Sequence, residues 1–163
     1  MRVALVIERF EPRGGVERVA WQVAHGLAAA GDEVHVVARK AAASEAVRLH
    51  LVRVASKWQP WRVVAFSRAA AHAAPRGDFD VVHSFSRTRR QDVYRAGGGC
   101  HAEFMRRTYT RTGAALRHLS PRHAVLLGLE ARVFADARQT LHCPSRRVRD
   151  EIAARHPDAA RRS

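Results

Sequence analysis

The chain has 163 residues, which suits a single domain that buries roughly 70% of its extended surface and needs no disulfide to build a core. Its two cysteines, Cys100 and Cys143, lack metal-ligand spacing, and a reducing cytosol fits them better than secretion. The first apolar run is too short for a signal peptide, and no later run approaches the ~20 residues of a membrane span.

Charge is the unusual bulk property. The chain has 29 Lys and Arg against 15 Asp and Glu, a formal net charge of +14. Such a charge attracts nucleic acid, anionic lipid headgroups or phosphorylated sugars. Arginine spread over every segment is equally explained by the composition of the source genome. Because no RNA-binding motif, zinc-finger spacing or basic zipper is present, nucleic acid is not the expected partner.

The first half of the chain predicts a βαβ unit. Residues 2–7 contain a continuous apolar run typical of a strand buried on both faces of a parallel sheet. Apolar residues at three- and four-residue spacing then predict a helix from near Val16 to Gly31, with the following buried face: Val16, Val19, Ala20, Val23, Ala24, Leu27 and Ala28. A second strand follows at 34–38, so a parallel crossover is expected.

The remaining elements continue the alternation. Residues 41–46 predict a loop, 49–54 a strand, and 58–74 a helix with Trp61, Val64 and Ala65 near its apolar stripe. Strands are expected at 79–85, 92–96 and 139–144, and a helix from Pro121 to Ala135. The segment 102–118 has an irregular, basic pattern. Ser145 is expected to cap a last helix over 146–156, which Pro157 stops. We therefore predict an α/β fold, a single Rossmann-like open parallel sheet with helices on both faces.

Gly14 and Gly15 lie at the first strand-to-helix junction. Paired glycines there either permit a tight turn or let a phosphate approach the free N–H groups of the helix. In open α/β sheets ligands bind at the carboxyl ends of the strands, and the same rule collects residues 83–87, 98–103 and Ser145 at that edge. This convergence favours the phosphate interpretation and predicts that the Gly14 turn and the His101 segment lie on one side of the molecule. The glycine spacings of a dinucleotide site and of a P-loop are both absent.

At this point the sequence resembles a known family. The residues that carry the likeness are 2–6, Gly14 to Arg18, 29–37 and 79–83, and more particularly the run from Asp92 to Glu103. They are similar to the N-terminal, acceptor-side half of retaining, nucleotide-sugar-dependent GT-B glycosyltransferases of the family 4 type. The run 92–103, with Leu129 to Phe134 and Cys143 to Ser145, resembles the branch that builds the lipopolysaccharide core.

The resemblance implies transfer of a sugar from a nucleotide-sugar donor to a glycan or lipid-linked acceptor, with no metal and no other cofactor. It implies that Gly14 and Gly15 contact the donor phosphate or sugar, and that Arg18, Arg87 and Glu103 lie on the acceptor side. His101 and His83 are the candidates for chemistry, since a histidine there could donate to a sugar hydroxyl or to the departing phosphate. Either one could instead simply cap a turn.

The sequence departs from the family pattern in the second domain, for which we expect no counterpart here. Residues 1–163 match one Rossmann-like half, and no counterpart of the donor-binding half follows Ser163. A lone half supplies one wall of the cleft, so we expect little or no turnover by itself and a separate C-terminal domain as a possible partner. The alternative is a non-catalytic module that binds an anionic glycan, lipid or nucleic acid.

The stretch from Phe104 to His123 combines basic and aromatic residues. It predicts peripheral docking on an anionic membrane, for a protein located in the cytoplasm or on the inner face of the cytoplasmic membrane. A solvated connection is the alternative interpretation.

Overall fold

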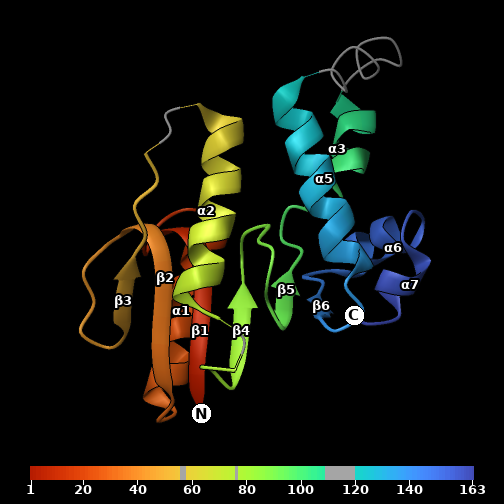
Figure 1. Ribbon diagram of the computed structural model, residues 1–163. Coiled ribbons are helices and arrows are strands. Elements are labelled where there is room, and N and C mark those ends of the chain that lie inside the picture. The colour runs from red at the N-terminus through yellow and green to blue at the C-terminus, as the bar shows by residue number, and fades with distance from the viewer. Residues whose placement is uncertain (56–57, 76, 109–119) are drawn as a thin grey trace.

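The chain forms an open sheet of six parallel strands flanked by helices (Figure 1). A computed structural model describes residues 1–55, 58–75, 77–108 and 120–163. The sheet order is β3-β2-β1-β4-β5-β6. The strands are β1 (Arg2–Phe10), β2 (Glu33–Ala41), β3 (Arg48–Leu51), β4 (Val81–Ser84), β5 (Val93–Arg95) and β6 (Thr140–His142). The predicted fold class is therefore confirmed, and the order reverses between β1 and β4, where such sheets bind ligands.

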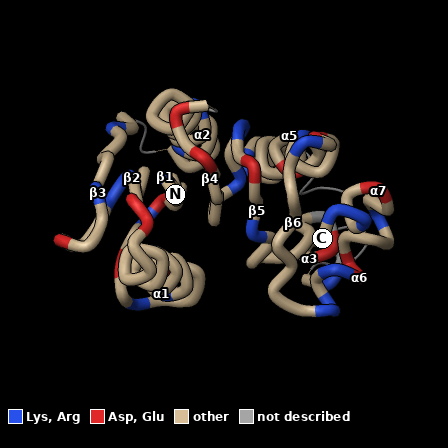
Figure 2. Tube along the Cα trace, turned by 90° about the horizontal axis from the view of Figure 1, so that it is seen from below, with Lys and Arg blue, Asp and Glu red and all other residues tan. Residues whose placement is uncertain are grey.

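Helices cover both faces of this sheet. They are α1 (Val16–Ala29), α2 (Gln59–Ala73), α3 (His101–Thr108), α5 (Pro121–Ala135), α6 (Arg146–Ala153) and α7 (Pro157–Ala160). Figure 2 shows α1 on one face and α2 with α5 on the opposite face. All strands are parallel, so their carboxyl ends meet at one edge, the upper edge in Figure 1.

The helix α1 packs as its periodicity predicts. Ala20 and Ala24 are completely buried against Leu5 and Val36, in one cluster that also holds every other residue of the predicted apolar face. Gly31, at a φ of +92°, ends the helical run in the left-handed conformation that glycine favours.

The predicted apolar stripe of α2 is wrong. Phe66 and Ala70 pack on the sheet beside Val82, whereas Trp61 is 57% exposed. The helix carries alanine on several faces, so the hydrophobic pattern does not fix its rotation. The single phenylalanine sets the buried side instead.

Two further predictions need correction. Residues 102–108 belong to the helix α3, where Glu103 accepts a hydrogen bond from Arg107 one turn later at 2.9 Å. Of the segment predicted to be irregular, 109–118 lie outside the described residues. The last predicted helix, expected to run to residue 156, ends at Ala153, and Pro157 begins the short helix α7, at a position where the missing proline N–H is not needed.

Candidate functional site

The turn between β1 and α1 uses its two glycines differently. Gly14 has a φ of +95°, and a Cβ built there would lie 2.8 Å from Glu17 Oε2. Gly15 has a φ of −86°, and a Cβ there would meet nothing within 4 Å. The tight turn therefore explains Gly14 but not Gly15. Gly15 is the N-cap of α1 and supplies no side-chain cap, so it leaves open space beside the first turn of the helix.

The glycine loop 97–99 lies beside this turn. The Cβ position of Gly97 is 3.8 Å from Val16 Cγ2, at the first residue of α1. The Cβ position of Gly98 is 4.0 Å from Arg87 Nη2. The Gly14 turn and the His101 segment thus lie on the same side of the molecule. The strand-end rule, by which ligands bind at the carboxyl ends of parallel strands, predicts this arrangement.

A cleft of about 350 Å³ lies between α2 and α5 at the carboxyl edge of the sheet. Its walls include Glu8, Gly98, His101, Phe104 and two cationic side chains, Arg87 and Arg122. Two of the predicted site residues, Arg87 and His101, therefore share one cleft. The cationic walls suit an anionic or hydroxyl-rich ligand.

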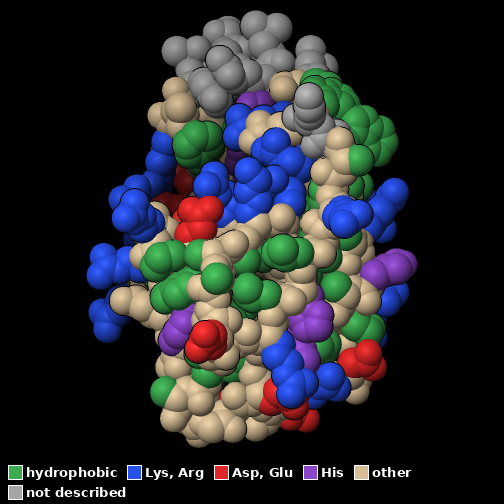
Figure 3. Space-filling view, turned by 90° about the vertical axis from the view of Figure 1, so that its left-hand side faces the viewer, with side chains coloured by type: hydrophobic (Ala, Val, Ile, Leu, Met, Phe, Trp, Pro, Cys, Tyr) green, Lys and Arg blue, Asp and Glu red, His purple; other side chains and the backbone are tan. Residues whose placement is uncertain are grey.

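Glu8 sets part of the charge at this cleft. Its Oε1 accepts hydrogen bonds from Arg39 Nε and Arg62 Nε, each at 3.1 Å. One carboxylate thus faces two guanidinium groups, so a positive excess remains. Figure 3 shows Lys and Arg side chains gathered on the adjoining face, below the atoms drawn in grey.

His101 is a buried, neutral member of the cleft wall. Its Nε2 lies 3.0 Å from His123 Nδ1, and its ring stacks on Phe104. Burial lowers its pKa to about 4, and the neighbouring Arg87 charge adds to the effect. At neutral pH the imidazole can give or take a hydrogen bond, but it is not a protonated acid.

Glu130 of α5 organises this wall, and the site prediction missed it. Its Oε2 accepts from the backbone N–H of His101 at 2.6 Å and from Arg87 Nη2 at 3.3 Å. Its Oε1 accepts from the Cys100 thiol at 3.2 Å. Glu130 is 3% exposed, and a single acid on an apolar helix face was the signal available in the sequence.

The other predicted residues lie elsewhere. His83 projects from the middle of the sheet against Phe85 and does not line the cleft. Arg18 is exposed on α1. Glu103 lines a second hollow, of about 390 Å³, together with Gly98, and its carboxylate pairs with Arg107.

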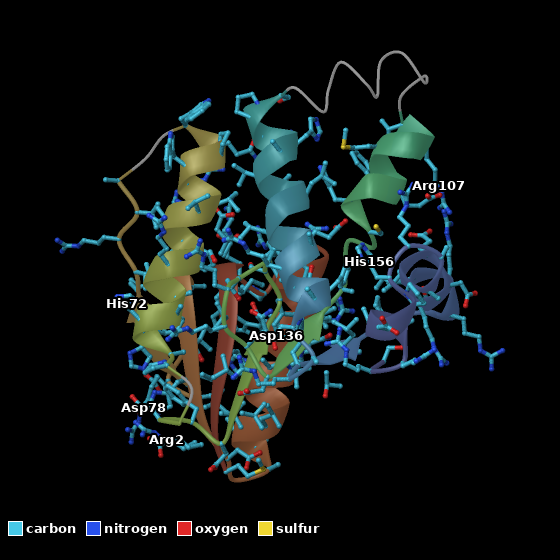
Figure 4. The ribbon with its side chains drawn as sticks, turned by 45° about the vertical axis from the view of Figure 1, so that its right-hand side comes forward. Arg2, His72, Asp78, Arg107, Asp136 and His156 are labelled. Carbon is cyan, nitrogen blue, oxygen red and sulfur yellow. The ribbon has the colours of Figure 1, made fainter. Side chains whose placement is uncertain are left out.

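This second hollow lies where α3 faces α6, and we call it the α3–α6 groove. Arg107 reaches across it to Glu151 Oε1 at 2.8 Å (Figure 4). Arg155 approaches Glu103 Oε2 at 3.6 Å. The acidic and basic groups at this groove largely neutralise one another, so it lacks the positive excess of the α2–α5 cleft.

One group of described residues has donors suited to a metal. The ligand atoms of Cys100, Glu130 and His156 lie within 4.8 Å of one another. The Glu130 carboxylate in this group already accepts the three hydrogen bonds given above, which accounts for its burial without a cation.

None of the described helices combines the length and apolar character that crossing a bilayer requires.

A parallel sheet of this order, with glycine turns and cationic side chains at its carboxyl edge, defines a Rossmann-like domain of the kind found in GT-B enzymes. The chain belongs to Glycosyltransferase Family 4, whose sequence profile matches residues 13–162.

Among solved structures, the chain resembles the crystal structure of WaaG, a glycosyltransferase involved in lipopolysaccharide biosynthesis, with a TM-score of 0.84 and 22% sequence identity. The match covers 95% of this chain and 42% of that one, so the chain spans less than half the length of this relative. No curated protein sequence matches it at a significant level.

Proposed function

We propose that this chain is the acceptor-side half of a retaining glycosyltransferase that transfers a sugar from a nucleotide-sugar donor to a glycan or lipid-linked acceptor. Membership of Glycosyltransferase Family 4 supports the reaction class. The open space at Gly15 carries the proposal, because a turn alone does not require a glycine at that position.

The two ends of the carboxyl edge would divide the substrates. The donor diphosphate would approach Gly15 and the N–H groups of α1, where backbone donors and the helix dipole favour an anion. The acceptor would lie in the α2–α5 cleft against Arg87 and His101. Neutral His101 suits a hydrogen bond to a sugar hydroxyl, whereas Arg87 suits an acceptor phosphate.

A second Rossmann-like half would complete the cleft, since WaaG is more than twice as long as the matched region. The involvement of WaaG in lipopolysaccharide biosynthesis supports an acceptor of the lipopolysaccharide core type. The proposal therefore implies a cytoplasmic site of action, at the inner face of the membrane that carries such acceptors. It names no metal or other cofactor.

A nitrogen–proton correlation NMR titration with millimolar UDP-glucose tests the proposal on the purified chain. We expect saturable shifts of the amides at Gly14 to Val16 and at the 97–99 loop. Gly15→Ala should weaken the response about tenfold or more, because a methyl group takes the ligand's space. Gly26→Ala, which adds a methyl group to α1 where nothing lies within 4 Å, is the matched control.

The result that would contradict the proposal is an unchanged response in Gly15→Ala. Shifts scattered over the surface, or none near Gly15, would also contradict it. If short DNA produced the larger and saturable shifts, the chain would be a nucleic-acid-binding module instead.

A further inference from the structure

Three basic side chains from neighbouring strands share the face of the sheet that α1 covers. His83 pairs with Leu5 in the β1–β4 register, and Leu5 packs on α1. His83 also pairs with Val93, and Arg95 lies two residues further along β5, so Arg95 projects from the same face. Arg95 in turn pairs with His142 of β6, which places all three side chains together.

The charge of Arg95 has no carboxylate beside it. Among the described residues, Arg95 forms no ion pair, and its Nε is buried without a hydrogen-bond partner. Its Nη1 lies 2.5 Å from the Cβ position of Gly97, so the guanidinium occupies space that only a glycine leaves free. Because Arg95 is only half-buried, its guanidinium keeps donors that an anion could accept from.

The two histidines extend this uncompensated cluster. His83 Nε2 is buried without a hydrogen-bond partner, and the His83 and His142 rings lie 6.0 Å apart. Burial lowers the pKa of His83 to about 4, with His142 and Arg95 adding to the effect. Burial and then Arg95 lower the pKa of His142. No carboxylate contributes to either shift.

The cluster is open to solvent on one side. His142 is exposed, and Thr140, on the same face of β6, is exposed as well. On the other side Gly97 lies between Arg95 and Val16, the first residue of α1. A small anion could therefore reach Arg95 without unfolding the sheet.

We propose that Arg95, His83 and His142 form a binding site for a phosphate group. A guanidinium presents a planar fork of donors that matches two phosphate oxygens, and each imidazole adds one N–H donor. The tetrahedral phosphate can accept from donors on three strands at once. This site does not include the α2–α5 cleft and goes beyond the sugar-transfer proposal.

Histidine side-chain NMR on the purified chain tests the site, with the signals assigned by His83→Gln and His142→Gln. Inorganic phosphate should shift the His83 and His142 rings saturably, and chloride at equal ionic strength should not. Bound phosphate should raise the pKa of His83 by about one unit or more, because an opposite charge favours the protonated ring. Arg95→Gln should raise the half-saturating phosphate concentration about tenfold or more, and Arg95→Lys less.

Arg138→Gln is the matched control, since that arginine is 84% exposed and lies outside the cluster. An equal response to chloride, or an undiminished phosphate response in Arg95→Gln, would overturn the site. If Arg95→Gln does not fold, the exposed His142→Gln decides in the same way. A glucose 1-phosphate arm assigns the source: tighter binding than phosphate indicates a phosphate ester, and weaker binding the free ion.

Discussion

Replacing Glu130 by alanine removes the carboxylate that joins α5 to the loop before α3. The change leaves the buried His101 N–H without its acceptor and the Arg87 guanidinium without its counterion, while Arg87 Nη2 keeps its hydrogen bond to the Gly99 carbonyl at 3.3 Å. Stranding a buried cation costs about 3–5 kcal/mol. We therefore expect Glu130→Ala to lower the free energy of unfolding by about 4 kcal/mol, out of a typical total of about 5–15. Glu130→Gln should cost about 2 kcal/mol, because the amide oxygen can still accept from His101.

Urea unfolding followed by circular dichroism at neutral pH measures these changes. Glu45→Ala is the matched control, since Glu45 is exposed, and it should stay within about 0.5 kcal/mol of the parent chain. The double variant Arg87→Ala with Glu130→Ala should lose clearly less than the sum of the single changes. Additive losses, or a Glu130→Ala variant as stable as the control, would refute the role assigned to this carboxylate.

Three further predictions concern other parts of the chain. As the pH falls from 6.5 to about 4, the unfolded chain binds a proton at His83 before the folded chain does. The free energy of unfolding should therefore fall by at most roughly 3 kcal/mol, and thermal unfolding should show a smaller fall in His83→Gln. Gly14→Ala should cost about 1–2 kcal/mol because of its positive φ, while Gly15→Ala should change the urea midpoint little. Arg162 donates to the carbonyls of Phe134, Asp136 and Gln139 behind α5, so Arg162→Ala should cost about 2–3 kcal/mol in calorimetry, and Arg161→Ala, at an 81% exposed side chain, almost nothing.

The sheet was predictable because its strands are short apolar runs separated by turn residues. Burial on both faces leaves a continuous apolar signal in β1 and β2, which does not depend on long-range contacts. The helix α3 was not predictable in this way. Its sequence is largely polar and follows three glycines. Its ion pair from Arg107 to Glu151 of α6 joins residues that are far apart in the sequence, so no local pattern reveals it.

The site divides along the same line. The strand-end rule brings Arg87 and His101 together, because it needs only the parallel topology. Arg95 escaped notice because its direction depends on the register of β4, β5 and β6, which no local pattern fixes. A charged residue two positions before a glycine run was the sign available in the sequence. The different roles of Gly14 and Gly15 also could not be predicted, because they depend on backbone angles that the sequence does not show.

Gly98 lines both the α2–α5 cleft and the α3–α6 groove. Phe104 lines both spaces as well, so these two residues belong to the wall of each. Two ligands, one in the α2–α5 cleft and one in the α3–α6 groove, would both contact the Gly98 backbone. If a ligand in one space changes the affinity for a ligand in the other, thermodynamic linkage requires the reverse effect to be equal. We therefore expect binding in the two spaces to be coupled.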